Sequence, residues 1–313
     1  MNPALIATGV QVLLVVVIAP LLVGVMRQVR ARLEGRAGAG IWQPWRDLRK
    51  LLRRQPVTPD GTGWAFRLAP LLLVGSALTV AAVVPLLTTA SPLDPAADLF
   101  AVVGLLALGT VVLALAALDT GTAFGGMGAS REMTILALVE PTILVAVFAL
   151  SARVGSTNLS SIVLATLHEP LRVVSPTSLM AAAALIVVAV AETGRLPVDN
   201  PSTHLELTMI HEAMVLEYAG ADLALVELAA SLRLTVLLGL LASLFAPWGI
   251  AGADLTSLPI AALAFAGKVL VLAAGLAAIE VFLAKLRLFR VPELLAGSFV
   301  LALLAVTTSF FLV

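Results

Sequence analysis

The chain has no cysteine, only three histidines, and little charge. Without cysteine it forms no disulfide, offers no thiolate nucleophile and supplies no cysteine ligand to zinc or to an iron–sulfur cluster. Asp, Glu, Lys and Arg make up 12% of the 313 residues, whereas soluble domains contain roughly 25%. Nineteen bases balance nineteen acids, so no excess of positive charge favours binding to nucleic acid.

The chain is instead rich in apolar residues, which make up 60% of it, and its mean hydropathy is +1.08. A helix needs about 20 apolar residues to cross a bilayer. The first apolar stretch is too long for a signal peptide, and no basic residue precedes it. We therefore expect an all-α, polytopic membrane helix bundle, a single integral membrane domain over 1–313. About eight spans are predicted, roughly at 4–26, 66–89, 99–118, 133–152, 176–194, 222–247, 258–282 and 292–312.

Basic residues are shared unevenly between the loops of this predicted bundle. Fourteen lie in loops on one side, and one or two lie on the other. Because basic loops stay in the cytoplasm, we expect the loop 27–65 and the acid-rich segment 192–222 to be cytoplasmic and both termini to lie outside. The fourteen are Arg27, Arg30, Arg32, Arg36, Arg46, Arg49, Lys50, Arg53, Arg54, Arg131, Arg195, Lys285, Arg287 and Arg290.

Residues 41–54 of the basic loop are predicted to form a short amphipathic helix. Its apolar residues would lie on one side and its cations on the other, as in helices that lie at the membrane interface. The helix is either an ordinary cytoplasmic anchor or a segment that frames an opening or docks a partner subunit. The residues expected to contact lipid or a hydrophilic partner are Trp42, Trp45, Arg46, Arg49, Arg53 and, in a later loop, Arg131.

Ionisable side chains inside membrane spans are costly, so each one needs a reason. Glu140 directly precedes Pro141, whose missing N–H frees the carbonyl near Ala137. A buried carboxyl beside such an opened turn can hold water and exchange protons; the alternative is a neutral acid that only packs two helices. Glu192 ends the fifth span three residues before Arg195, so the two are predicted to pair on one helix face.

The segment 199–222 alternates acids with apolar residues in a helical rhythm, and predicts a helix from Pro201. At ~100° per residue, Glu206 and Glu217 lie about 20° apart, and two histidines lie together on roughly the opposite side beside Glu212. Two polar stripes favour a helix that lines a wet cavity. The two histidines are seven positions apart, unlike the i, i+4 spacing of helical metal ligands, so we expect no metal site. The histidines are His204 and His211.

The sixth and seventh spans also contain charges. Lys268 and Glu280 are separated by about 18 Å along their helix, so they do not pair with each other. Glu227 and Arg233 lie in the span before them. Spaced acids and bases suit a proton relay, and they equally suit polar groups that join helices.

No phosphate loop, dinucleotide fingerprint or nucleophile elbow is present in the sequence. The glycine-rich run 125–128 is predicted to be a tight turn before a helix that starts at Ser130. Glu132 would then lie in the first turn of that helix, where a negative charge is favourable.

Two stretches carry a family resemblance: AETGRLPVDNPSTHLELTMIHEAMVLEYAG at 191–220 and GMGASREMTILALVEP at 126–141. They resemble the membrane subunit family of respiratory complex I subunit 1 and of formate hydrogenlyase subunit 4 or hydrogenase-4 component C. The resemblance covers nearly the whole chain, including QPWRD in the basic loop. Complex I members usually carry E-T-N-R-x-P-F-D-L-P and an acidic run, whereas NPSTHLELTMIHE and VPELL resemble the [NiFe]-hydrogenase branch. With the acidic run partly replaced, contacts to quinone are not carried over.

The resemblance implies that the chain is a proton-conducting junction subunit in a prokaryotic plasma membrane. This subunit would anchor hydrophilic subunits that carry iron–sulfur clusters and a nickel–iron centre. It would pass protonation changes to antiporter-like membrane subunits and bind no cofactor itself, although quinone is possible. The alternatives are the quinone-site subunit of an NADH:quinone oxidoreductase and a purely structural anchor. The expected pathway comprises Glu140, Glu192, Asp199, Glu206, Glu212 and Glu217, with Glu227, Lys268 and Glu280 as later stations and Arg195 holding Glu192 ionised.

Overall fold

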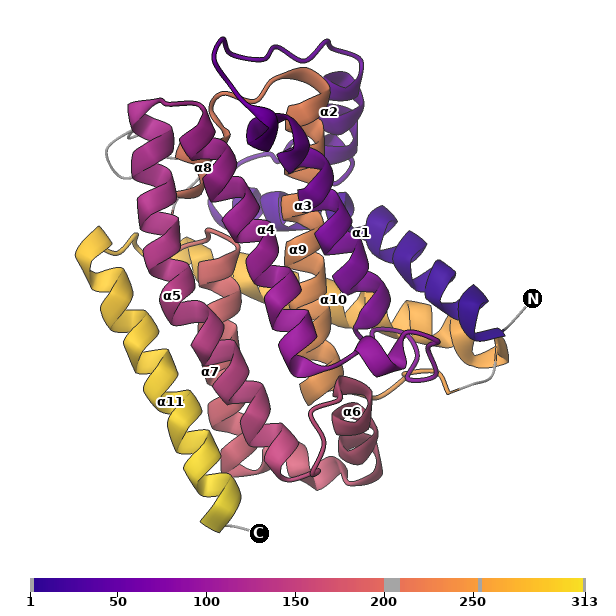
Figure 1. Ribbon diagram of the computed structural model, residues 1–313. Helices are drawn as coiled ribbons and strands as arrows, with labels where there is room; N and C mark the ends of the chain where they lie inside the picture. Colours follow the sequence, from indigo (N-terminus) through magenta and orange to yellow (C-terminus); the bar gives the residue numbers. More distant parts are fainter. Residues whose placement is uncertain (1–2, 200–208, 253–254, 312–313) are drawn as a thin grey trace.

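The computed structural model describes residues 3–199, 209–252 and 255–311, and the regular elements in these residues are all helical (Figure 1). Seven helices are long and apolar enough to cross a membrane. They are α1 (Pro3–Leu33), α3 (Trp64–Val83), α4 (Leu99–Asp119), α5 (Ala123–Ala152), α9 (Gly220–Phe245), α10 (Leu258–Phe282) and α11 (Val291–Phe311). The predicted all-α membrane bundle is therefore confirmed.

The shorter elements include α7 (Pro176–Glu192), which occupies the place of the fifth predicted span. Its 17 residues are at the lower limit for crossing a bilayer. The other short helices are α2 (Gln43–Leu52), α6 (Leu159–His168) and α8 (His211–Val215). Single 3₁₀ turns lie at Asp94–Ala96, Pro170–Val174, Leu255–Ser257 and Leu288–Arg290.

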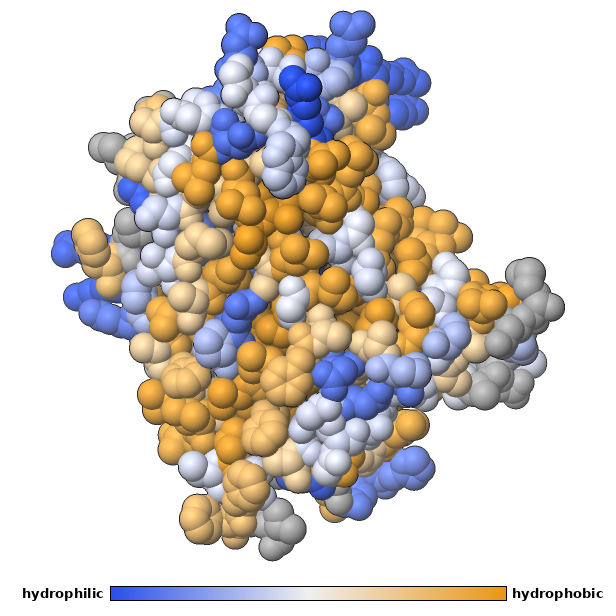
Figure 2. Space-filling view, viewed as in Figure 1, coloured by the Kyte–Doolittle hydropathy of each residue, from blue (hydrophilic) through white to orange (hydrophobic). Residues whose placement is uncertain are grey.

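The long helices pack in a simple order. α3 lies between α4 and α9, α4 also contacts α5, and α5 packs with α7 and α11. On the other side of α9, α1 and α10 lie against each other and run obliquely to the rest (Figure 1). Apolar side chains cover the middle of the face in Figure 2, and hydrophilic ones gather at its upper end, where α2 lies. This banded surface is that of a protein surrounded by lipid.

The loops collect at two opposite ends of the bundle, as an alternating membrane topology requires. At one end, the Thr88 hydroxyl donates to the Gly252 carbonyl at 3.1 Å and links the loops before α4 and before α10. At the other, the Asp119 carboxylate accepts hydrogen bonds from the N–H groups of Gly63 (2.8 Å) and Phe66 (3.0 Å) at the start of α3. The end with α2 is the one for which the sequence predicts the basic loops.

Two local predictions were wrong. The glycine-rich run 125–128 is helical, because α5 begins at Ala123, capped by the Thr122 hydroxyl, rather than at Ser130. Glycine allows a close approach here: a Cβ on Gly128 would lie 2.9 Å from the carbonyl oxygen of Ile210. Glu132 is therefore in the helix interior and not in a first turn.

The helix predicted from Pro201 is not continuous to residue 222. Within 209–219, only the five-residue α8 is helical. Gly220 then adopts a φ of 59° and starts α9 in a new direction. Glu206 and His204 lie outside the described residues, so their predicted stripes remain predictions.

Candidate functional site

A chamber of about 590 Å³ lies at the α2 end of the bundle, between α1, α2, α8, α9 and the loop 193–199. Its wall has more acids than bases. The acids that line it are Asp47, Asp199, Glu212, Glu227 and Glu280, and the bases are Arg27, Arg30 and Arg195. Most of these residues are far apart in sequence, and the fold brings them to one water-accessible space.

Helix α2 forms one edge of this chamber, as the prediction of an amphipathic helix that frames an opening requires. Pro44 and Leu48 are buried and line the chamber. The Trp45 indole donates to the Val17 carbonyl of α1 at 3.3 Å, and Asp47 lies 3.7 Å from Arg27. The side that stays exposed carries Trp42, Arg46, Arg49 and Arg53, the residues predicted to contact lipid or a partner.

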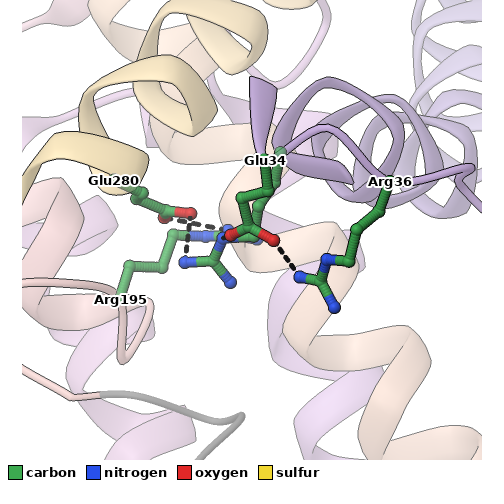
Figure 3. Close-up of polar contacts among 5 residues, drawn as sticks. Glu34, Arg36, Arg195 and Glu280 are labelled. Carbon is green, nitrogen blue, oxygen red and sulfur yellow. Dashed lines mark hydrogen bonds and ion pairs between the residues drawn. The ribbon is translucent and has the colours of Figure 1, made fainter. Parts of the chain in front are cut away.

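Glu280 of α10 is held by two arginines from different parts of the chain (Figure 3). Arg195 Nη1 donates to Glu280 Oε1 at 3.1 Å, and Arg30 Nη2 lies 3.3 Å from Glu280 Oε2. The Glu280 side chain is 3% exposed. The cluster joins α1, α10 and the loop after α7, and its two arginines border the chamber. By contrast, the neighbouring Glu34–Arg36 pair lies at the exposed end of α1.

Asp199 fixes the segment that leads into α8. Its carboxylate accepts a hydrogen bond from Lys285 Nζ at 2.8 Å, and from the N–H groups of Ile210 (3.2 Å) and His211 (3.3 Å). Arg131 of α5 donates to the Met209 carbonyl at 2.8 Å. Arg131 was predicted to contact lipid or a hydrophilic subunit, and the structure shows that it ties α5 to the start of α8.

The predicted Glu192–Arg195 pair was not found; Glu192 pairs instead with Arg233 of α9. Arg233 Nη2 donates to Glu192 Oε2 at 2.5 Å and to the Leu106 carbonyl at 3.1 Å. The reason is that α7 ends at Glu192 and Gly194, at a φ of 56°, turns the backbone away, so Arg195 reaches Glu280. Glu192 Oε1 and Arg233 Nε are buried without a hydrogen-bond partner in the described residues.

A second cavity, of about 40 Å³, lies beside this pair between α3, α4 and α9. Its walls are mainly apolar, with Ser76, Arg233 and His211 as the polar contributors. His211, Val226 and Ala230 line both this cavity and the chamber, so the two spaces share a wall.

Helix α5 brings two carboxyls towards the interior. Glu132 is buried, at 7% exposure, and lies close enough to interact electrostatically with Glu192, Arg233 and Asp199. Sequence reasoning missed Glu132 because the glycine run was interpreted as a turn. Glu140, two turns further along, is half-buried between the exposed residues Ala137 and Pro141. It therefore lies at the border between the interior and the outward face of α5.

The remaining predicted pathway residues are less closely connected. Glu212 and Glu227 line the chamber, and their carboxyl groups form no hydrogen bond or ion pair with any described residue. Glu217 is half-buried in the turn before α9 and is not a chamber residue. Lys268 is half-buried on α10, which packs against α1 and α9 and not against α5. The structure therefore does not place Lys268 close to the predicted pathway residues of the chamber or of α5.

Burial changes the acid–base properties of chamber side chains outside the spans. Burial lowers the pKa of the His211 imidazole, although the negative charge of Glu212 raises it. Burial raises the pKa of the Tyr218 hydroxyl, which donates to the Phe66 carbonyl at 3.0 Å while its ring stacks on that of Phe66. His211 is therefore mainly neutral near pH 7 and able to accept a proton.

Comparison with known proteins identifies the family to which the chain belongs. The sequence model of the family described as NADH dehydrogenase matches residues 6–311. Formate hydrogenlyase subunit 4 of Escherichia coli (strain K12) is 38% identical over 95% of this chain and 95% of its own length. Hydrogenase-4 component C of the same organism is 38% identical over 76% of this chain and 74% of its own length.

The fold also matches a solved structure. A chain of the membrane-bound sulfane sulfur reductase, described as an archaeal respiratory membrane complex, superimposes with a TM-score of 0.82. The match covers 98% of this chain and 99% of that chain at 19% identity, so it establishes the likeness of fold alone. The family match over nearly all residues, together with the two relatives, shows that the chain is a multi-pass membrane protein that belongs to the NADH dehydrogenase family of respiratory complex I subunit 1.

Proposed function

We propose that this chain is the membrane-anchoring, proton-conducting junction subunit of a membrane-bound [NiFe]-hydrogenase or formate hydrogenlyase-type complex. The identity of 38% to formate hydrogenlyase subunit 4 and hydrogenase-4 component C supports that branch. The observation that carries the proton-conducting role is the buried Glu192–Arg233 pair, which joins α7 to α9 and interacts electrostatically with Glu132 of α5. Ionisable groups at such positions in membrane proteins are characteristic of proton pathways.

The route that this geometry supports begins in the chamber, whose wall contains five acids. It continues to Glu192 and Glu132 in the interior and leaves the chain at Glu140, on the border of the outward face of α5. A change of charge at a redox centre above the chamber would shift the pKa of the chamber acids, at about 1.4 kcal/mol per pKa unit. Protons would then move along the carboxyls towards an antiporter-like membrane subunit beside α5.

The chamber end is the place where hydrophilic subunits would dock. In this proposal they carry the iron–sulfur clusters and the nickel–iron centre, and α2 with its exposed arginines contacts either them or lipid phosphates. The chain then lies in a prokaryotic plasma membrane with α2 in the cytoplasm and both termini outside, as the distribution of basic residues favours.

The volume of the chamber favours a second candidate function. About 590 Å³ is within the range of small-molecule sites, so a quinone headgroup would fit in a complex of the NADH:quinone oxidoreductase type. Quinone-dependent electron transfer by the purified complex distinguishes the two: the hydrogenase assignment predicts hydrogen turnover without quinone, and a strict requirement for quinone supports the second candidate.

Replacing Glu140 with Gln tests the proton-conducting role. In proteoliposomes that contain the whole complex, we expect the number of protons moved per electron to fall at least about tenfold, because a neutral amide cannot relay protons. Glu293→Gln is the matched control, since Glu293 is an exposed acid at the start of α11 and should have no effect. A normal ratio in Glu140→Gln would favour a purely structural anchor, in which substitutions in α2 detach the hydrophilic subunits instead.

A further inference from the structure

His211 occupies an unusual position because it lines both the chamber and the small cavity beside Arg233. The other two residues that the cavities share, Val226 and Ala230, are apolar. His211 is thus the one ionisable side chain of the described residues that faces both spaces. A group that transfers protons between the chamber and the interior has to lie at such a boundary.

The backbone around His211 is held firmly despite the shortness of α8. The Asp199 carboxylate accepts the N–H groups of Ile210 and His211, and Arg131 binds the Met209 carbonyl. The ring nitrogens of His211, by contrast, form no hydrogen bond with any described residue. The backbone is therefore fixed while the imidazole is available to water in the two cavities.

Charged groups lie on both sides of the ring. Glu212 and Asp199 line the chamber, Arg233 lines the small cavity, and Glu192 is paired with Arg233. Helix α5, which packs against α8, contributes Glu132 and Arg131. The imidazole therefore has ionisable groups both on the chamber side and on the side of the small cavity.

We propose that His211 passes protons between the chamber and the small cavity, and this inference rests on the proposed function. One ring nitrogen takes a proton from chamber water or from Glu212, forming an N–H bond as the donor O–H bond breaks. The other nitrogen releases its proton to water in the small cavity beside Arg233 and Glu192. The imidazole is neutral again, as the other tautomer, and a ring rotation restores the starting state.

The volume of the small cavity and the neutral state of the imidazole both agree with this proton transfer. The cavity of about 40 Å³ has room for about three water molecules at roughly 10–15 Å³ each, and Ser76 and Arg233 are polar groups that can hold them. Burial keeps the imidazole mainly neutral, and a neutral imidazole has one nitrogen that accepts and one that donates. An arginine at this position would stay charged and block the exchange.

The test uses the whole complex in proteoliposomes, with protons moved per electron as the readout. We expect His211→Ala to lower this ratio at least about tenfold, and imidazole added to the buffer to restore it in a concentration-dependent way. His211→Gln fills the space, so it should show the same loss without rescue. Glu293→Gln, an exposed acid at the start of α11 that does not line the chamber, is the control and should behave normally.

The following results would overturn the proposed role of His211. A normal ratio in His211→Ala overturns the inference, and so does a loss that imidazole leaves unchanged, because a structural role gives no chemical rescue. If His211→Ala does not assemble, a normal ratio in His211→Gln overturns it instead. Glu140→Gln in the same assay separates the two proposals: if it loses coupling while the His211 variants are normal, only the His211 inference fails.

Discussion

An Arg233→Leu variant is expected to lose roughly 3–5 kcal/mol of unfolding free energy, because it leaves the Glu192 carboxylate buried without its partner. The side chains of Glu192 and Arg233 are 3% and 16% exposed, so water compensates little for the missing charge. Arg233 also donates to the Leu106 carbonyl of α4, and Leu cannot replace that bond. Unfolding of the purified chain in detergent micelles, followed by tryptophan fluorescence, measures the loss.

The double variant Glu192→Gln/Arg233→Leu is the informative comparison. Replacing both members of a buried ion pair by neutral side chains of similar size is often nearly neutral for stability. We therefore expect the double variant to regain most of the stability that Arg233→Leu loses. If the two variants unfold at the same denaturant concentration, the cost comes from lost packing and not from an unpaired charge.

Glu280→Gln is expected to cost about 2–3 kcal/mol of unfolding free energy, somewhat less than a fully buried pair. The substitution leaves the guanidinium groups of Arg30 and Arg195 facing each other without the carboxylate that holds both. The chamber gives these arginines some access to water, which limits the cost. The same fluorescence experiment measures this loss of unfolding free energy. We expect the contact between α1 and α10 to loosen in the variant as well.

Glu34→Gln supplies the matched control for Glu280→Gln. Glu34 also lies near two arginines, Arg30 and Arg36, but its side chain is 30% exposed at the end of α1. Exposed ion pairs contribute little, at most about 1 kcal/mol. Equal losses in the two variants would show that Glu280 is not the residue that joins α1, α10 and the loop after α7.

The sequence alone predicted the features that depend on local composition. Runs of about 20 apolar residues identified the spans, because the hydrophobic length of a helix is set by the bilayer. The cost of a charge in hydrocarbon singled out Glu140, Glu192 and Glu280. The alternation of Leu48 with cations identified α2, and the structure adds that its buried side closes a chamber.

Pairing partners could not be predicted in the same way. Glu192 and Arg233 are 41 positions apart in the sequence, and only the packing of α7 against α9 brings them together. Spacing in the sequence favoured Arg195, three residues away, because it takes no account of the turn at Gly194. The position of His211 between two cavities also depends on six helices other than α8, so no local pattern could reveal it.

The length of α5 was mispredicted for a related reason. Glycine usually indicates a turn, and Gly125 and Gly128 here serve close helix packing instead: Gly128 lies against Ile210, Ala213 and Met214. The consequence was that Glu132 was not recognised as an interior acid.

The most direct measurement of proton conduction uses Glu192→Gln/Arg233→Leu, since this double variant removes both ionisable groups while retaining the fold. Protons moved and electrons transferred are recorded together in proteoliposomes containing the whole complex. If the buried carboxylates carry protons, electron transfer persists while the protons moved per electron fall at least about tenfold. An unchanged number of protons per electron would contradict a proton path through this subunit.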